Sequence, residues 1–192
     1  MAALARVMAS RGYAGATVVE IARTAGLAPG LVHYHFADKH EILLELCSEV
    51  AATIQQRYQA RMSDTSTPRE RLSAFIDAHV VIGKDADADA VAAWSAVAAE
   101  AMRDPAVRVV YRRHIEREMS ELGRLLTDAL REQGRRLKDV AGKAAVILAA
   151  IEGAFRIATS APGATPRGFA ARGIKQVAAA LIAAEPKVRG RA

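Results

Sequence analysis

The chain has 192 residues, 52% of them hydrophobic, which is enough for one large domain or for a small domain joined to a larger one. Its 27 basic and 21 acidic side chains leave a net charge of +6, which suits an anionic partner, either nucleic acid or a membrane surface. The single cysteine excludes an internal disulfide, and no apolar run approaches the roughly 18 residues of a membrane span, so we expect a cytoplasmic protein without a membrane segment.

Apolar residues recur at helical spacing along the chain, and no stretch alternates with period two for long enough to predict a sheet. The first helix is expected over residues 1–11, before Gly12, and the arginine within it argues against a signal peptide. Thr17, with Glu20 three residues later, predicts a capping box at the start of a second helix, which Gly26 ends.

Two further helices follow directly. Pro29 fits the first turn of a short helix. Asp38, with Glu41 three residues later, predicts the cap of a much longer helix that runs to about Met62. The polar, breaker-rich segment 63–68 after it is expected to be a linker.

The rest of the sequence predicts five more helices and a frayed tail. The fold class is therefore all-α, with about nine helices: three short N-terminal ones, a long linking helix and a C-terminal bundle. The five later helices are expected at about 68–83, 89–102, 105–133, 138–159 and 167–184.

The stretch from Ile21 to Val32 has the steric pattern of a helix-turn-helix. Ala22 and Gly26 lie four residues apart, where small residues let a second helix cross closely after a tight turn. Ile21, Leu27 and Val32 are expected to supply the apolar contacts beneath. In such a motif the second helix presents its outer face to a DNA major groove.

These residues belong to a longer pattern, "GYAGATVVEIARTAGLAPGLVHYHFADKHEILLEL", which resembles the DNA-binding domain of TetR-type transcriptional regulators. The aromatic-x-Phe-x-x-Lys-x-x-x-Leu pattern that follows the helix-turn-helix makes the resemblance specific. It implies a DNA-binding domain over residues 1–46 and a ligand-binding and dimerisation domain over residues 47–192. The residues that carry it are Gly12, Thr17, Ile21, Ala22, Ala25, Gly26, Gly30, Tyr34, Phe36, Lys39 and Leu43.

The resemblance implies a role in DNA binding for seven residues. Thr17 would touch a phosphate at the start of the second helix. Gly30 would let the backbone of the recognition helix come close to base edges, while Tyr34 and Lys39 would each contact a phosphate. The full set is Thr17, Ala28, Pro29, Gly30, His33, Tyr34 and Lys39.

Three features depart from the family pattern. Ala28 stands where the family usually has a serine or threonine, so one cap bond and one phosphate contact are lost. His33 replaces a tyrosine and titrates near neutrality, which would make operator binding pH-sensitive. The chain also starts late relative to the pattern, so that either the sequence is truncated or its first helix is short.

His33, His35 and His40 lie close together in the sequence and raise the question of a metal site. His33 and His35 are two residues apart on a helix, about 200° around its axis, so they cannot face one ion. No cysteine or carboxylate stands at a known ligand spacing, so no metal site is expected. His35 and Phe36 fit packing better than base contacts, and Lys39 has the alternative of a solvated helix start.

The C-terminal bundle is expected to hold the dimer interface. The helix at 138–159 is apolar on two sides, so that one side can enter the chain's own core and the other can face a second copy, a single monomeric core being the alternative. The segments around Trp94 and Phe155 resemble the betaine-responsive, BetI-like branch of the family, although the resemblance does not carry the ligand over. The expected interface residues are Ile147, Ile151, Phe155, Ile174, Val177 and Leu181.

Aromatic residues make up only 5% of the chain, so their placement is informative. Seven residues on different predicted helices are expected to line a mainly apolar effector cavity, although each alone also fits ordinary core packing. They are Phe75, His79, Trp94, Met102, Tyr111, His114 and Phe155. The arginine-rich run 103–136 is interleaved with carboxylates and is expected to be a solvated face.

The sequence therefore predicts a ligand-responsive transcriptional repressor that binds a near-palindromic operator in double-stranded DNA as a homodimer and is released by a small-molecule effector. An enzyme would need a nucleophile, a phosphate loop or a metal spacing beside His79 or His114, and none is found. No catalytic residue and no cofactor is therefore expected. The alternative is a helical DNA- or protein-binding module without an effector.

Overall fold

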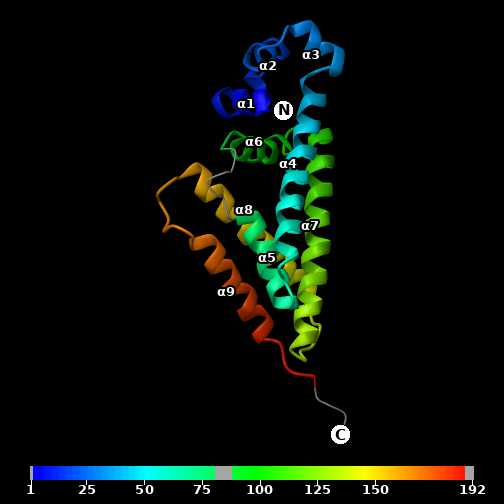
Figure 1. The fold of residues 1–192 in the computed structure, drawn as a ribbon, viewed down its shortest axis with the longest axis vertical. Coiled ribbons are helices and arrows are strands. Elements are labelled where there is room, and N and C mark those ends of the chain that lie inside the picture. Colours follow the sequence, from blue (N-terminus) through cyan, green and yellow to red (C-terminus); the bar gives the residue numbers. More distant parts are fainter. Residues whose placement is uncertain (1, 81–87, 189–192) are drawn as a thin grey trace. The chain divides into compact units, whose positions relative to one another are not determined.

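The computed structural model describes residues 2–80 and 88–188, and within these ranges it contains nine helices and no β-strand (Figure 1). The predicted all-α class is confirmed; the expected helix end at 81–83 lies outside the described residues. The helices are α1 (Ala2–Gly15), α2 (Val18–Ala25), α3 (Pro29–His35), α4 (Lys39–Met62), α5 (Pro68–Val80), α6 (Ala88–Glu100), α7 (Pro105–Glu132), α8 (Val140–Ser160) and α9 (Phe169–Ala183).

The helices form two compact units. Unit 1 comprises the described parts of Met1–Thr53 and Gly83–His114, and unit 2 those of Ile54–Ile82 and Ile115–Ala192. Helices α4 and α7 therefore each begin in unit 1 and end in unit 2. Packing places α6 and the start of α7 in the same unit as the helix-turn-helix, whereas the predicted domains divide the chain once, after residue 46.

The first helix is longer than the sequence predicts. Gly12 interrupts it with a left-handed φ of 69°, but helical backbone resumes after the kink and continues to Gly15. The cap of α2 is as predicted, because the Thr17 hydroxyl oxygen accepts a hydrogen bond from the backbone N–H of Glu20 at 3.2 Å. The Glu20 carboxylate pairs with Arg11 at 2.5 Å, which connects α2 to α1.

The turn between α2 and α3 needs Gly26 for one of its two predicted roles, the end of α2, and not for a close crossing of helices. A Cβ at Gly26 would meet nothing within 4 Å, so no close crossing of helices requires the glycine. The φ of 70° at this position favours glycine, because this left-handed conformation is strained for other residues. It ends α2 and lets the Leu27 N–H donate to the Ala22 carbonyl at 2.9 Å. Ile21 and Val32 are buried as predicted, but Leu27 is 44% exposed, because the turn directs it away from the core.

A continuous apolar core fills unit 2, where α8 and α9 lie side by side and pack against α5 (Figure 1). Leucines of α7 and one face each of α5, α8 and α9 supply most of it, as their helical spacing predicts. Its fully or nearly fully buried members include Leu72, Phe75, Ile76, Leu122, Leu125, Leu126, Leu130, Ile147, Ile151, Ile174 and Ile182.

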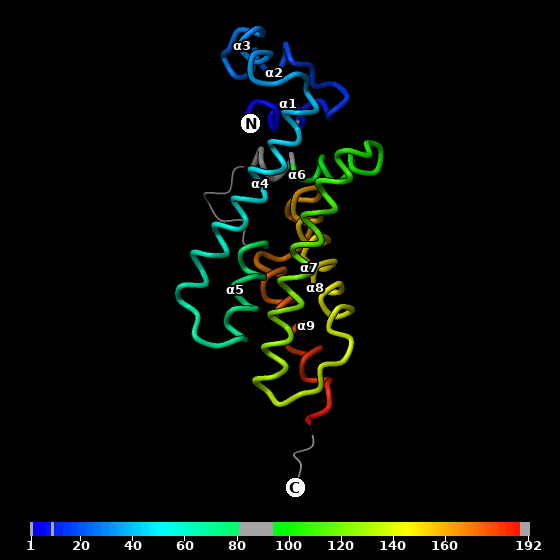
Figure 2. The backbone as a smooth tube through the Cα atoms, turned by 90° about the vertical axis from the view of Figure 1, so that its right-hand side faces the viewer, coloured from blue at the N-terminus to red at the C-terminus, as the bar shows by residue number. Residues whose placement is uncertain are grey.

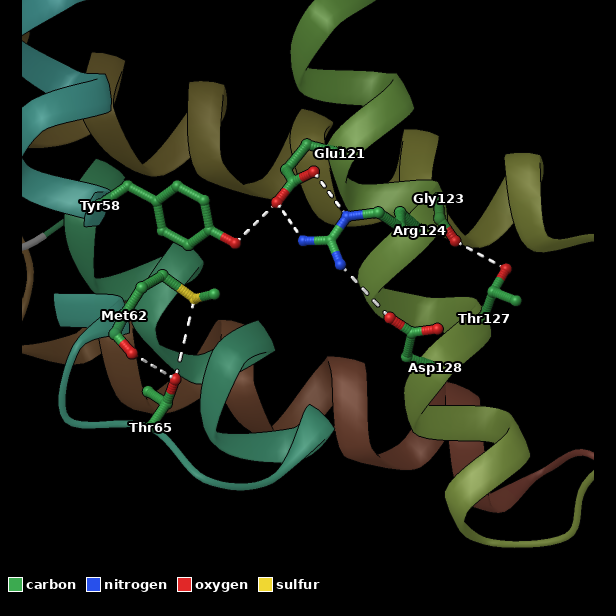
Figure 3. Close-up of polar contacts among 8 residues, drawn as sticks. All are labelled: Tyr58, Met62, Thr65, Glu121, Gly123, Arg124, Thr127 and Asp128. Carbon is green, nitrogen blue, oxygen red and sulfur yellow. Dashed lines mark hydrogen bonds and ion pairs between the residues drawn. The ribbon is translucent and has the colours of Figure 1, made fainter.

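A polar network connects α4 to α7 within unit 2 (Figure 3). The Tyr58 hydroxyl donates to Glu121 at 2.7 Å, and burial, followed by the neighbouring Glu121 carboxylate, raises the pKa of Tyr58. Arg124 binds both oxygens of Glu121, at 2.6 and 2.9 Å, and Asp128 at 3.3 Å. The Arg124–Asp128 pair has i,i+4 spacing, and the partly exposed side chains of this network fit the solvated face expected of the arginine-rich run.

The described part of the tail is anchored, not frayed as expected. The Arg135 guanidinium donates to the carbonyl of Glu185 at 2.6 Å, and the Val188 N–H donates to the Gly134 carbonyl at 2.7 Å. The Lys143 ammonium lies 2.5 Å from the Glu185 carboxylate, and both residues are buried. These contacts join residues some fifty positions apart, which local spacing does not reveal.

Candidate nucleic-acid interface and ligand site

The outer surface of α2, the turn and α3 collects most of the residues that the sequence assigns to DNA binding. Val32 is the buried residue of α3, and the other six residues of the helix are exposed. Tyr34 is 82% exposed, and Gly30 has open space where a Cβ would stand. Figure 2 shows α2 and α3 as two short helices joined by a tight turn. The structure thus places Ala28, Pro29, Gly30, His33 and Tyr34 on one exposed helix and its start.

The N-terminus of α2 offers an anion site beside this helix. Thr17 is exposed, and its hydroxyl oxygen accepts the cap bond, which leaves the hydroxyl proton able to donate. The first N–H groups of a helix carry partial positive charge and commonly bind phosphate. The predicted phosphate contact of Thr17 therefore fits the geometry and stays a prediction.

Three exposed apolar residues on this surface were not predicted as site residues. Val19 is 61%, Leu27 44% and Leu31 46% exposed. Exposed apolar side chains at a major-groove surface are suited to contact thymine methyl groups. Their signal in the sequence was weak, because a short helix of seven or eight residues gives too few turns to separate the inner from the outer face.

Ala28 has no side-chain cap bond to offer α3, as the departure from the family pattern predicted. Lys39, by contrast, is only partly exposed and already has a contact. Its ammonium donates to the Tyr13 carbonyl at 3.1 Å and lies 4.4 Å from the centre of the Tyr13 ring. A lysine ammonium has three donors, so the predicted phosphate contact stays a prediction, but the lysine also connects α4 to α1.

The three neighbouring histidines do not converge. His33 and His35 are exposed on α3, and the His35 ring packs edge-to-face against Tyr34 with 5.1 Å between centroids. His40 lies 3.3 Å from the Asp104 carboxylate. Among the described residues, no three histidine, cysteine, aspartate or glutamate side chains are grouped so that they could hold a metal ion.

The residues expected to line one effector cavity form two separate aromatic clusters. In unit 1, Trp94 lies 4.7 Å from His114 and 5.6 Å from Tyr111, measured between ring centroids, and Trp94 and His114 are buried. Met102 is 74% exposed in the turn after α6, so its assignment to the effector cavity was wrong. The bend of the chain after α6 turns its side chain to solvent.

The second cluster lies in unit 2. The rings of Phe75 and His79 are stacked with 4.2 Å between centroids, and Tyr58 meets Phe75 edge-to-face at 5.5 Å. His79 Nδ1 lies 2.8 Å from the Phe75 carbonyl, and Nε2 lies 2.9 Å from the Glu118 carboxylate. Phe155 is half-buried on α8.

The expected dimer interface is partly wrong. Ile147, Ile151 and Ile174 are at most 5% exposed in the chain's own core, so they have no surface to offer a second copy. Phe155 and Leu181 are half-buried, and Val177 is 40% exposed. The second face of α8 is apolar and exposed, as predicted, with Val146 51% and Ile157 44% exposed.

No helix in the described ranges combines the length and the apolar character needed to cross a bilayer.

Comparison with protein families gives two matches along the chain. Residues 1–46 match the family described as bacterial regulatory proteins of the tetR family, and residues 68–185 match that of the BetI-type transcriptional repressor, C-terminal region. The "HTH-type transcriptional regulator BetI" of Rhizobium meliloti is 36% identical over 113 residues, which cover 57% of this chain and 55% of that protein. The BetI protein of Brucella anthropi is 30% identical over 138 residues, 71% of each chain. The chain thus spans little more than half the length of the Rhizobium relative.

Solved structures share the fold. A transcriptional regulator from Rhodococcus superposes with a TM-score of 0.81 at 21% identity, covering 98% of this chain and 96% of that one. A transcriptional regulator from Saccharomonospora viridis, solved in complex with choline, superposes with a TM-score of 0.76 at 22% identity, covering 96% and 95%.

Proposed function

Because the chain belongs to the TetR family of bacterial regulatory proteins, with a BetI-type C-terminal region, we propose that it is a DNA-binding repressor that acts as a homodimer under the control of a small molecule. The observation that carries the proposal is the exposed surface of α2 and α3. On α3, Val32 alone points inward, and the rest of the helix is available to a groove. Base edges would be read by the exposed residues of α3, while phosphate contacts would come from the residues around them.

The two parts of this surface have different tasks. Gly30 and His33 on α3 would face the major groove, whereas Tyr34 on α3, Thr17 at the start of α2 and Lys39 at the start of α4 would contact phosphates. Contacts to bases select the sequence, and contacts to phosphates supply most of the affinity and its salt dependence.

A second copy of the chain is proposed to pack on the outer faces of α8 and α9. Val146, Gly153 and Ile157 follow one another at helical spacing on α8, and Val177 is exposed on the neighbouring α9. A two-fold axis through such a face makes the contact self-complementary and gives the dimer two recognition helices. Two copies of α3 would then read two half-sites about one DNA turn apart.

The effector is proposed to be a small cation bound at the cluster of Trp94, Tyr111 and His114. Aromatic faces attract ammonium groups, tryptophan most strongly, and the Trp94 ring here lies 4.7 Å from that of His114 and 5.6 Å from that of Tyr111, measured between centroids. The Saccharomonospora regulator with the same fold binds choline. Such a ligand releases DNA if it binds more tightly to a conformation in which the two α3 helices no longer match the operator.

Selection of bound duplexes from random DNA tests the repressor proposal. A near-palindrome with two half-sites is expected, whereas recovery of unrelated sequences would leave only a non-specific DNA-binding module.

Intrinsic fluorescence tests the effector proposal, because Trp94 is the chain's one tryptophan and reports on the cluster directly. Choline should change the emission in a saturable way and weaken operator binding, whereas 3,3-dimethylbutan-1-ol, its neutral analogue, should do neither. Calorimetry on Trp94→Leu should show no choline binding. Equal responses to the two compounds would rule out a cation site.

A further inference from the structure

The start of α4 and the turn before α7 meet through one pair of side chains within unit 1. His40 is the second residue of α4, and its Nδ1 atom lies 3.3 Å from Oδ2 of Asp104. Both side chains are a little more than a quarter exposed, so water weakens the attraction without removing it. The contact joins the helix that leaves the DNA-binding surface to a turn 64 positions further along the chain.

The Asp104 side of this contact is held firmly. The other carboxylate oxygen of Asp104 accepts from the backbone N–H groups of Ala106 at 2.8 Å and Val107 at 3.3 Å, which caps α7. Partial burial opposes ionisation, but these two bonds, and then the charge of His40, lower the pKa of Asp104. Arg108 braces the same turn, donating to the carbonyl of Ala101 at 2.9 Å. The carboxylate therefore has a fixed position against which His40 is set.

A short, hydrogen-bonded segment, residues 36–38, connects the recognition helix α3 to the start of α4, where His40 lies. The Asp38 carboxylate accepts from the N–H groups of His40 at 2.8 Å and Glu41 at 2.9 Å, and the Glu41 carboxylate accepts from the Ala37 N–H at 2.7 Å. The predicted cap of α4 is thereby confirmed. Because this link is short and these bonds hold it to α4, we expect a displacement of the first turn of α4 to displace the end of α3 with it.

Other charged groups surround the pair. Lys39 on α4 donates to Tyr13 on α1, and burial, followed by the charges of Asp104, Glu100 and Asp38, raises the pKa of Tyr13 to about 12. The phenol therefore stays neutral and the lysine keeps its cation–π contact throughout the range in which histidines titrate. Arg108 adds a second cation from α7, which its two carbonyl contacts hold against the turn.

We infer that His40 is a positioning residue for operator binding, which holds the first turn of α4, and through it α3, against Asp104 at the start of α7. The inference rests on the proposed function. Loss of either side chain would release the first turn of α4 from the turn before α7. Any effector that moves the turn before α7 would act on α3 by the same contact.

The test is operator affinity by fluorescence anisotropy, with the duplex selected from random DNA. His40→Ala and Asp104→Asn should each weaken binding by about two- to fivefold, and the double variant should be no weaker than either. Asparagine keeps the oxygen that caps α7, so the helix itself is spared. Additive losses in the double variant would overturn the inference.

His40→Gln separates positioning from mere packing. Its amide can donate to the Asp104 carboxylate, so affinity should be near that of the wild type, with the loss seen in His40→Ala restored. Affinity of His40→Gln as low as that of His40→Ala would refute the role of His40, whereas failure of the wild type to bind any duplex would refute the proposed function instead.

Discussion

Replacement of Gly30 by leucine should separate DNA reading from folding. Gly30 is the second residue of α3, and a Cβ there would meet nothing within 4 Å. Its φ is not left-handed, so a side chain adds no backbone strain, and removing a helical glycine stabilises by up to about 1 kcal/mol. The free energy of unfolding should therefore stay the same or rise slightly.

The same leucine side chain would project into the space that a DNA groove must occupy. Holding α3 away from the bases removes the contacts of about two base pairs at ~1–3 kcal/mol each, which weakens specific binding by ~30-fold or more. Non-specific affinity should change little, because Thr17 and Lys39 at the rim are untouched. Alanine at position 30 provides the milder control.

Fluorescence anisotropy with the selected duplex and with a scrambled one measures the specific and the non-specific affinity. Urea unfolding measures the free energy of unfolding. Specific binding of the leucine variant equal to that of the wild type would show that α3 is not the reading helix. Loss of specific and non-specific binding together with unfolding would show that the surface is a packing surface instead.

Three other predictions concern unit 2. Lys143→Met should lower the free energy of unfolding in urea by about 3–5 kcal/mol because it leaves the Glu185 carboxylate buried without its partner, and Glu185→Leu added to it should recover most of the loss. Ile147→Ala should lower the free energy of unfolding by about 2–5 kcal/mol in the same assay. Val146→Ala should leave the monomer stable and weaken dimerisation in sedimentation equilibrium. The reverse pattern would show that Val146 lies in the core and Ile147 in the dimer interface. Backbone N–H groups before α5 lower the pKa of Glu70 to about 2, so its contribution to stability is present above the usual carboxyl range and is lost as the pH falls from about 5 to 2. Glu70→Gln should therefore flatten the acid limb of stability against pH, and an unaltered limb would contradict that cause.

Local signals in the sequence predicted the helix starts well. Thr17, Asp38 and Pro105 each begin or cap the helix that their spacing indicates. These features involve residues within four positions of one another, so a linear pattern contains all the information needed. Helical spacing likewise predicted that α8 has two apolar faces. It did not show which face lies in the core, and the assignment of Ile147 to the dimer interface was wrong.

The polar contacts between distant parts of the chain could not be predicted from local spacing. Lys39 with Tyr13, His40 with Asp104 and the anchoring of Glu185 all join residues far apart in the chain. Polar partners of this kind are decided by how helices pack, and no period in the sequence records them. The exposed position of Leu27 follows likewise from the left-handed turn at Gly26.

We propose that two copies of α3 in one dimer read one operator. Sedimentation velocity of the protein with the selected duplex, at micromolar concentration and moderate salt, measures the number of chains on each duplex. We expect a dimer in the absence of DNA and two chains, or a multiple of two, on each duplex. A monomer that binds singly to the whole site with full affinity would contradict it.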